Sequence, residues 1–240
     1  YYGPLAPSDH IVPRQRPQEP PQLAERRMTL SDPRVSEPYV YRSYLAPERD
    51  PGDQKQAAAL TVLAELLGGS GTTSVLAKAL QFGPHPAAIY ASAGYDGDTV
   101  DDGTFSLFVM PVPGVSLADA EGAMDRAVEQ FIKDGVNADD LVRIKAQIRA
   151  SDIYSRDSAG ALARRYGEGL AIGLTMADIR DWPTILQSVT AEDVMAAART
   201  VLNRNNAVTG WLSAPEGAPP GGAVPQGAAA NPAVMEGTTE

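Results

Sequence analysis

Five segments of the chain have the residue pattern of strands, with aromatic and β-branched residues in short runs or alternating with polar ones. They lie near residues 26–32, 38–46, 87–95, 104–112 and 205–213. Successive side chains of a strand point to opposite faces, so these segments suit a sheet. Only the acidic turn at 96–103 separates the third strand from the fourth, which predicts a hairpin.

Apolar residues at helical spacing fill the stretches between these strands. Helices are expected over about 53–67 and about 73–82, and two long helices are expected after residue 116. Residues that recur every three or four positions lie on one face of a helix. The residues that define these faces are Leu60, Leu63, Leu66 and Leu67, then Leu117, Ala120, Met124, Ala127, Val128 and Phe131, and finally Leu141, Ile144 and Ile148.

Four helix starts carry a capping signature. Ser116, Asn137, Thr175 and Thr190 are each followed three residues later by an aspartate. A side-chain oxygen at the first position accepts a backbone N–H of the first turn, and the helix dipole favours the carboxylate there.

The order of the elements determines the fold class. Two strands, two helices and two further strands precede a run of helices and a final strand. Paired strands and helices in blocks are typical of an α+β fold, with a mostly antiparallel sheet covered on one face by helices. The strand–helix–strand alternation of a dinucleotide-binding domain is missing.

Both ends differ in composition from this core. Residues 1–23 carry six prolines and are expected to form an extended linker. In 215–240, 16 of 26 residues are Pro, Gly or Ala, which predicts a disordered tail. The folded domain is therefore expected over residues 24–214.

Charge and composition exclude several classes of function. The net charge of −10 and a pI of about 4.7 argue against a nucleic acid partner. The chain has no cysteine, which excludes thiol catalysis and zinc ribbons. No apolar run approaches the roughly 18 residues of a membrane span. Residues 1–20 lack the basic start and apolar centre of a signal peptide.

The glycine-rich stretch LLGGSGTTSVLAKALQF at 66–82 suggests a phosphate-binding loop at first sight. Such a loop follows a strand and ends in Gly-Lys-Ser/Thr, whereas here the glycines follow a helix. The expected structure is a helix–helix connection, with a C-cap at Gly68 and Gly69 and an N-cap at Thr72 or Thr73.

The sequence gives little support for a metal site or for a catalytic nucleophile. His10 and His85 lie far apart, and neither has a second histidine one helical turn away, so no metal ligands are assigned. The acidic turn 96–103 lacks the flanking helices and final glutamate of a calcium loop. With two such histidines a serine-based triad is not expected.

A charged cluster lies on a predicted helix in the segment ARRYGEGL, residues 163–170. It contains Arg164, Arg165, Tyr166 and Glu168. The favoured interpretation is a partly exposed helix with its own ion pairs, and a role in substrate binding or at an interface is the alternative.

Five segments carry a family resemblance: LSDPRV, RSYLAP, AAALTVLAELLGGSGTTSVLAKAL, YDGDTVDDGTFSLFVMPVPGVSLADAEGAMD and ARRYGEGLAIGLT. Together they resemble the insulinase/pitrilysin family of zinc peptidases, and within it the C-terminal half of bacterial members. The resemblance covers roughly residues 1–214. It implies one of two similar α+β halves that close around an unfolded peptide.

The resemblance also implies where the chemistry resides. The zinc motif of the family lies on the first long helix of the N-terminal half, and the corresponding helix here, 53–67, has no histidine. This chain is therefore expected to hold no zinc or other cofactor. The family's C-terminal half contributes an arginine and a tyrosine, six residues apart, that bind the substrate backbone. The tyrosine corresponds to Tyr90 and the arginine position to Gln81, with a spacing longer by a residue or two.

Three functions are compatible with this resemblance. The favoured one is the inactive half of a zinc endopeptidase, which walls a chamber and helps to bind unfolded peptide beside a zinc-bearing N-terminal half. The others are a structural or assembly subunit of the same fold and a free peptide-binding module. Because bacterial relatives are often exported, the resemblance favours the periplasm over the cytoplasm.

Overall fold

The sheet has five strands, and in this computed structural model they are described together with the rest of residues 4, 6, 22–69 and 71–215. The strands are β1 (Arg26–Ser31), β2 (Tyr39–Ala46), β3 (Ala88–Asp96), β4 (Gly103–Pro111) and β5 (Ala207–Ser213). Their order in the sheet is β1-β5-β2-β4-β3. The β1–β5 pair is parallel, and the other three pairs are antiparallel.

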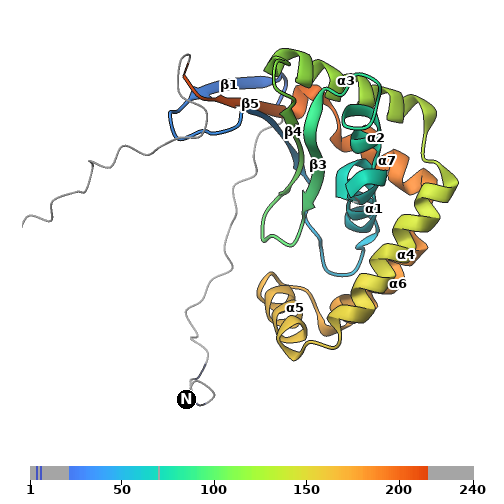
Figure 1. The fold of residues 1–240 in the computed structure, drawn as a ribbon. Helices are drawn as coiled ribbons and strands as arrows, with labels where there is room; N and C mark the ends of the chain where they lie inside the picture. The colour runs from blue at the N-terminus through green and yellow to red at the C-terminus, as the bar shows by residue number, and fades with distance from the viewer. Residues whose placement is uncertain (1–3, 5, 7–21, 70, 216–240) are drawn as a thin grey trace, which may run out of the picture.

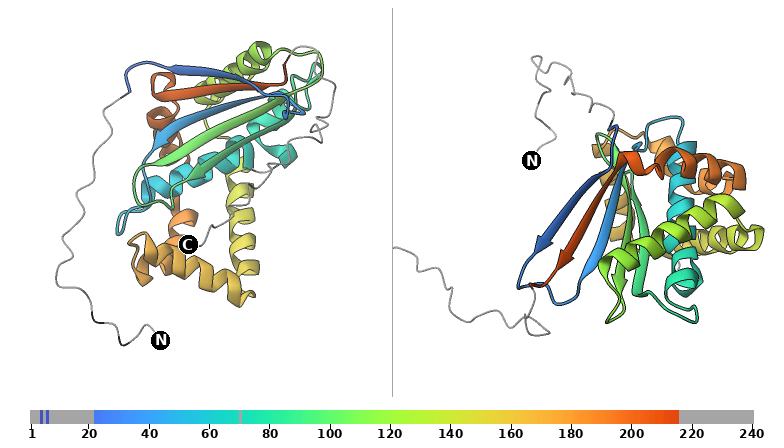
Figure 2. Two further views of the ribbon diagram at one scale, coloured as in Figure 1. Left: turned by 90° about the vertical axis from the view of Figure 1, so that its left-hand side faces the viewer. Right: turned by 90° about the horizontal axis from the view of Figure 1, so that it is seen from above.

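Seven α-helices accompany the sheet in the described part of the chain. They are α1 (Lys55–Ala64), α2 (Val75–Leu80), α3 (Leu117–Asp134), α4 (Ala138–Ser155), α5 (Ala159–Ala171), α6 (Met176–Ser188) and α7 (Ala191–Val201). Helices α1, α2, α3 and α7 lie on one side of the sheet, while α4 and α6 run away from it towards α5 (Figure 1). In the left view of Figure 2, seen from the side of the sheet away from these helices, the five strands lie side by side in front of them. The predicted α+β class is confirmed.

The core lies between the sheet and the helices because each central strand alternates. In β4, Phe105, Leu107 and Val109 are fully buried, whereas the residues between them are partly exposed. Val40 and Tyr44 of β2 face the same way. They pack in one cluster with the buried residues of α1, which include Leu60 and Leu63.

All four predicted helix caps are present. The side chains of Ser116, Asn137, Thr175 and Thr190 each accept the backbone N–H of the residue three positions on. Thr175 and Thr190 form complete capping boxes with Asp178 and Asp193.

The glycine-rich connection differs from its prediction. After α1 the chain continues in a π-helical turn over Glu65–Gly69 and a 3₁₀ turn over Gly71–Thr73. Gly68 and Gly69 therefore lie inside a helical turn instead of capping one. The N-cap of α2 is Ser74, whose hydroxyl accepts the N–H of Ala77, so the expectation of Thr72 or Thr73 was wrong. Thr72 and Thr73 belong to the 3₁₀ turn that precedes α2. The sequence pattern does not reveal this turn.

A buried network of charges fastens α3 to the sheet. Arg42 of β2 is only 1% exposed, and its guanidinium donates to Glu121 at 2.5 Å, to Thr209 at 2.9 Å and to Asp125. Glu121 also accepts from Arg27 of β1 at 2.5 Å and from the indole N–H of Trp211 at 2.7 Å. A charge this deep is tolerated only when its partners are supplied, and here α3 and β5 supply those of Arg42.

The predicted linker and tail lie almost entirely outside the described residues, which include only 4, 6, 22, 23 and 215 of those two segments. Within the described part of the chain, no helix is both long and apolar enough to cross a membrane.

Candidate functional site

The face of the sheet opposite the helices is apolar and uncovered by other described elements. Along β2 and β4 its residues alternate with those that are buried under the helices. We call this surface the open face; its side chains include Met28, Leu30, Tyr39, Tyr41, Tyr90, Phe108 and Met110. Figure 2 shows how all five strands present this face together.

Strand register brings residues of the open face into continuous rows. Met28 lies opposite Gly210, which lies opposite Tyr41. Tyr41 in turn lies opposite Phe108, and Phe108 lies opposite Ser92. One row therefore crosses the whole sheet from β1 to β3.

Large apolar side chains of the open face are highly exposed. Met28 is 65% exposed, Leu30 59%, Tyr90 52% and Tyr41 42%. A soluble protein seldom leaves so many large apolar side chains together in water unless the patch has a binding role.

Three aromatic rings meet at the β3 end of the open face. The centroids of Tyr39 and Phe108 are 5.0 Å apart, and those of Tyr90 and Phe108 are 5.8 Å apart in an edge-on arrangement. Such pairs hold their rings in fixed orientations. Tyr90 is thus oriented by its neighbours, and its hydroxyl has no hydrogen-bond partner among the described residues.

The alternation along β3 predicts Tyr90, Ser92 and Gly94 on one face and Ile89, Ala91, Ala93 and Tyr95 under the helices. Ala91 is buried, and Ala93 and Tyr95 pack against the core, as expected. Ile89 is an exception, since it is 50% exposed. The register shifts between Ala88 and Tyr90, so Ala88 takes the buried position and Ile89 is left out of the pairing.

Gln81 is the C-cap residue of α2 and is partly exposed. Its backbone N–H donates to the carbonyl of Ala77 at 2.9 Å. The chain then loops back until the N–H of Ala87 reaches the carbonyl of Leu80 at 2.8 Å, next to Gln81. Gln81 therefore lies near the start of β3, but no hydrogen bond between described residues joins its side chain to Tyr90.

The charged cluster of α5 makes a different set of contacts from the predicted one. Arg165 pairs with Asp152 of α4 at 2.6 Å and donates to the carbonyl of Ile179 at 3.1 Å. Arg164 has no ion pair with Glu168 or any other described residue. The expected pairing within the helix was therefore wrong: Arg165 pairs instead with a carboxylate of α4.

Metal ligands do not gather in the described residues: no group of three or more His, Cys, Asp or Glu could hold an ion there. His85 is exposed in the loop before β3, and His10 lies outside the described residues.

Sequence reasoning missed the aromatic neighbours of Tyr90. Tyr39, Tyr41 and Phe108 were assigned to strands without any site role. The alternation of 38–46 and 104–112 places them on the side opposite Tyr44 and Phe105, which could have indicated a shared aromatic surface.

Comparisons with known proteins identify the family to which this α+β fold belongs. A family model described as the peptidase M16 inactive domain matches residues 1–148. The chain belongs to this family, as the resemblance predicted. No curated protein matches the chain.

Solved bacterial structures share the fold. A protease from Helicobacter pylori is 20% identical with a TM-score of 0.76, over 85% of this chain and 48% of that one. A peptidase M16 inactive domain from Pseudomonas fluorescens is 18% identical with a TM-score of 0.64, over 85% and 47%. The first half of the periplasmic protease PqqL from Escherichia coli is 14% identical with a TM-score of 0.72, over 87% and 46%. This chain thus spans about half the length of each.

Proposed function

We propose that the chain is the non-catalytic half of a zinc-dependent endopeptidase. In this proposal the open face forms part of the wall of a substrate chamber and helps to bind unfolded peptide. The observation that carries it is the open face itself: a broad apolar and aromatic surface, on the side of the sheet that the described helices leave uncovered. Extended peptides of mixed sequence are bound well by such surfaces because aromatic rings tolerate many side chains.

The second half supplies the chemistry in this proposal. Membership in an inactive-domain family, and neighbours about twice as long, support a partner that bears the zinc site. The described residues of this chain offer no ligand cluster for zinc. Its own contribution is to bind and orient peptide.

Tyr90 is the residue we assign to the substrate. Its ring is held edge-on by Phe108, and its hydroxyl is free to donate to a peptide carbonyl. Gln81 lies near the start of the same strand, and the resemblance assigns it to the position where the family carries an arginine. It offers hydrogen bonds without a charge.

The first experiment mixes the purified chain with the zinc-bearing N-terminal half and follows cleavage of an unstructured peptide. We expect no cleavage by either half alone, cleavage by the mixture, and its loss when a chelator is added. If the two halves associate but never cleave, the chain is an assembly subunit and the proposal fails.

The second experiment tests Tyr90 in the same mixture. Tyr90→Phe removes one hydroxyl donor and should slow turnover by roughly ten- to a thousand-fold. Stability should barely change because the ring that packs on Phe108 remains. The matched control is Tyr154→Phe, since Tyr154 is 76% exposed on α4. Equal rates for the two variants would remove Tyr90 from the site.

A further variant tests Gln81. Gln81→Arg should preserve or raise activity if Gln81 occupies the arginine position.

A further inference from the structure

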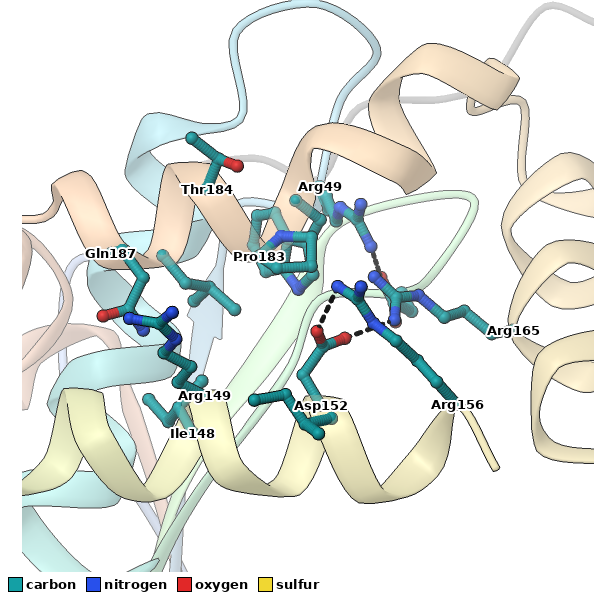
Figure 3. Close-up of a pocket in the computed structure, with 13 residues that line it drawn as sticks. Arg49, Ile148, Arg149, Asp152, Arg156, Arg165, Pro183, Thr184 and Gln187 are labelled. Atoms are coloured by element: carbon teal, nitrogen blue, oxygen red, sulfur yellow. Dashed lines mark hydrogen bonds and ion pairs between the residues drawn. The ribbon is translucent and has the colours of Figure 1, made fainter. Parts of the chain in front are cut away.

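A second hollow lies away from the open face, where the arm of α4, α5 and α6 faces the tip of the β3–β4 hairpin. It consists of two adjoining cavities of about 680 Å³ and about 620 Å³, which share Arg49, Asp98 and Arg165. These sizes fall within the range of pockets that hold small ligands or a few residues of peptide. Figure 3 shows the larger cavity between α4 and α6.

Five arginines line this hollow, which we call the arginine cleft: Arg49, Arg149, Arg156, Arg164 and Arg165. Three carboxylates face them, those of Asp98, Asp152 and Glu168. The lining therefore has an excess of positive charge, although the whole chain has a net charge of −10. A concave site lined by one sign of charge concentrates that field.

Two of these arginines hold the walls of the cleft in place. Arg49 is buried, donates to Gln54 at 2.5 Å and to the carbonyl of Asp178 at 3.2 Å, and stacks 3.9 Å from the ring centroid of Trp182. Arg165 connects α5 to α4 through Asp152. Their donors are used within the protein, so they form the frame of the cleft.

The carboxylate of Asp152 is already bound by two arginines. Arg165 and Arg156 both bind it at 2.6 Å, one on each oxygen, as Figure 3 shows. It has little remaining capacity to neutralise a further arginine nearby.

Arg149 and Arg164 remain without a partner among the described residues. Arg149 projects from α4 into the larger cavity, and Arg164 lines the smaller one from α5. Both are exposed, and each guanidinium presents a fork of donors that matches a carboxylate. Beside Arg149 the lining is apolar at Ile148, Ile153, Pro183 and Leu186.

We propose that the arginine cleft binds a carboxylate of a peptide at Arg149 in the larger cavity, with an adjacent apolar side chain against Ile148 and Pro183, while Arg164 in the adjoining cavity adds to the positive field. The carboxylate belongs to an acidic side chain or to a peptide C-terminus. This inference rests on the proposed peptide-binding function and adds a preference to it: the chain selects peptides that carry negative charge.

The test uses calorimetric titration of the 240-residue chain with three unlabelled peptides of about eight apolar and small residues. One has a central glutamate and an amidated end, the second has glutamine and a free carboxylate end, and the third has glutamine and an amidated end. We expect the neutral third peptide to bind about tenfold more weakly than at least one acidic peptide. The acidic peptide that binds identifies the source of the carboxylate. Equal binding of all three, or tighter binding of inorganic phosphate, would overturn the proposal.

Variants locate the binding. Arg149→Gln should weaken binding of the acidic peptide by about tenfold and Arg164→Gln by less. Both variants should keep the fold intact, since both side chains are exposed and have no partner among the described residues. Arg199→Gln is the matched control, because Arg199 is exposed on α7 outside the cleft. Wild-type affinity in the double variant Arg149→Gln/Arg164→Gln would also overturn the proposal.

A local optical signal gives an independent readout. The chain has two tryptophans, and Trp182 lines the cleft. In Trp211→Phe the remaining emission reports from Trp182, and the acidic peptide should change it while the neutral one does not.

Failure of this proposal is distinguishable from failure of the proposed function. The cleft is tested by binding to this chain alone, whereas the chamber-wall role is tested by cleavage with the zinc-bearing half. Arginine-dependent binding without any effect of Tyr90→Phe would support the cleft alone, and the reverse result would support the open face alone.

Discussion

Glu121 joins α3 to three strands of the sheet through Arg27 of β1, Arg42 of β2 and Trp211 of β5. Burial raises the pKa of its carboxyl, but hydrogen bonds from Arg27 and Trp211 and the charges of Arg42 and Arg27 outweigh that effect, so the net pKa is lowered. Because the folded pKa is depressed, this stabilisation is present above the unfolded pKa and is lost as the pH falls through the folded one.

Glu121→Gln keeps the shape of the side chain and removes its charge. In this buried site Arg42 then keeps Asp125 as a hydrogen-bonded carboxylate partner and Glu25 at 3.9 Å. We expect a loss of about 3 kcal/mol in the free energy of unfolding, because breaking a buried ion pair leaves a charge poorly compensated. Urea unfolding at neutral pH measures it.

The matched control is Glu129→Gln on the exposed side of the same helix, where Glu129 has no ion pair among the described residues. Its effect should stay within about 0.5 kcal/mol. Similar losses in both variants would mean that the buried network does not dominate the stability of this region.

At the residue scale the sequence predicted to which face of a strand a side chain points, but not the β-bulge at the start of β3. Alternation correctly separated Tyr90 from Ala91, since period two is a property of any extended chain. It misplaced Ile89, because one unpaired residue in a bulge reverses the pattern and leaves no composition signal. The depth of Arg42 was likewise not predictable, as it depends on partners 79 and 83 residues away.

Among the elements, the π-helical turn Glu65–Gly69 contains a glycine, Gly68, that is explained by a close approach between helix and strand. A Cβ atom added to Gly68 would lie 2.0 Å from the backbone nitrogen of Ala93 and 2.4 Å from the carbonyl carbon of Ser92. Backbone atoms of a sheet cannot move aside as a flexible side chain can. Glycine at 68 therefore lets the end of the first helix touch β3, the strand that carries Tyr90.

Gly68→Ala should destabilise the protein by about 1–3 kcal/mol, the usual cost of overpacking a core. Thermal unfolding of the variant beside Gly167→Ala gives the comparison. Gly167 lies in α5 with open space around it, so alanine there should stabilise the helix by about 0.5–1 kcal/mol. A Gly68→Ala protein as stable as the wild type would show that α1 and β3 are not held at this distance.

Some element boundaries could be predicted from the sequence and others could not. Ser116, Asn137, Thr175 and Thr190 were identified as caps because a capping pair lies within four consecutive residues. The cap at Ser74 was missed, because two threonines that also suit a cap precede it and the choice depends on where the π turn ends.

On the scale of the whole molecule, the sequence did not predict which distant strands pair with each other. The parallel β1–β5 pair inserts the last strand between the first two, and no local pattern records this. The arginine cleft was missed for the same reason, since its arginines span positions 49 to 165 and meet only through the arm of α4, α5 and α6. The α+β class was predictable because it depends on the order of elements alone.

The distribution of charge over the whole molecule also predicts how it responds to acid. Hydrogen bonds from Lys55 lower the pKa of Asp193 to about 2, and those from Arg34 lower the pKa of Asp32 to about 2. The pKa of Asp152 is lowered as well, because its bonds to Arg165 and Arg156 outweigh its burial. Groups with depressed folded pKa values stabilise the fold above their unfolded pKa, near 3.8 for aspartate, and this contribution disappears as the pH falls towards 2.

We therefore expect the free energy of unfolding to be steady from pH 7 to about 5 and to fall steeply between about pH 4 and 2. Protonation of the 30 carboxylates would also leave 20 Lys and Arg and 2 His as unbalanced positive charges. Urea unfolding at several pH values, with and without about 0.5 M NaCl, separates the two causes, since salt at this level screens repulsion between distant charges. Salt should restore only part of the loss, because it cannot replace the carboxylate hydrogen bonds. A profile that is flat down to pH 2, or one that salt restores fully, would show that these ion pairs contribute nothing to holding the α4–α5 arm and the capped helices in place.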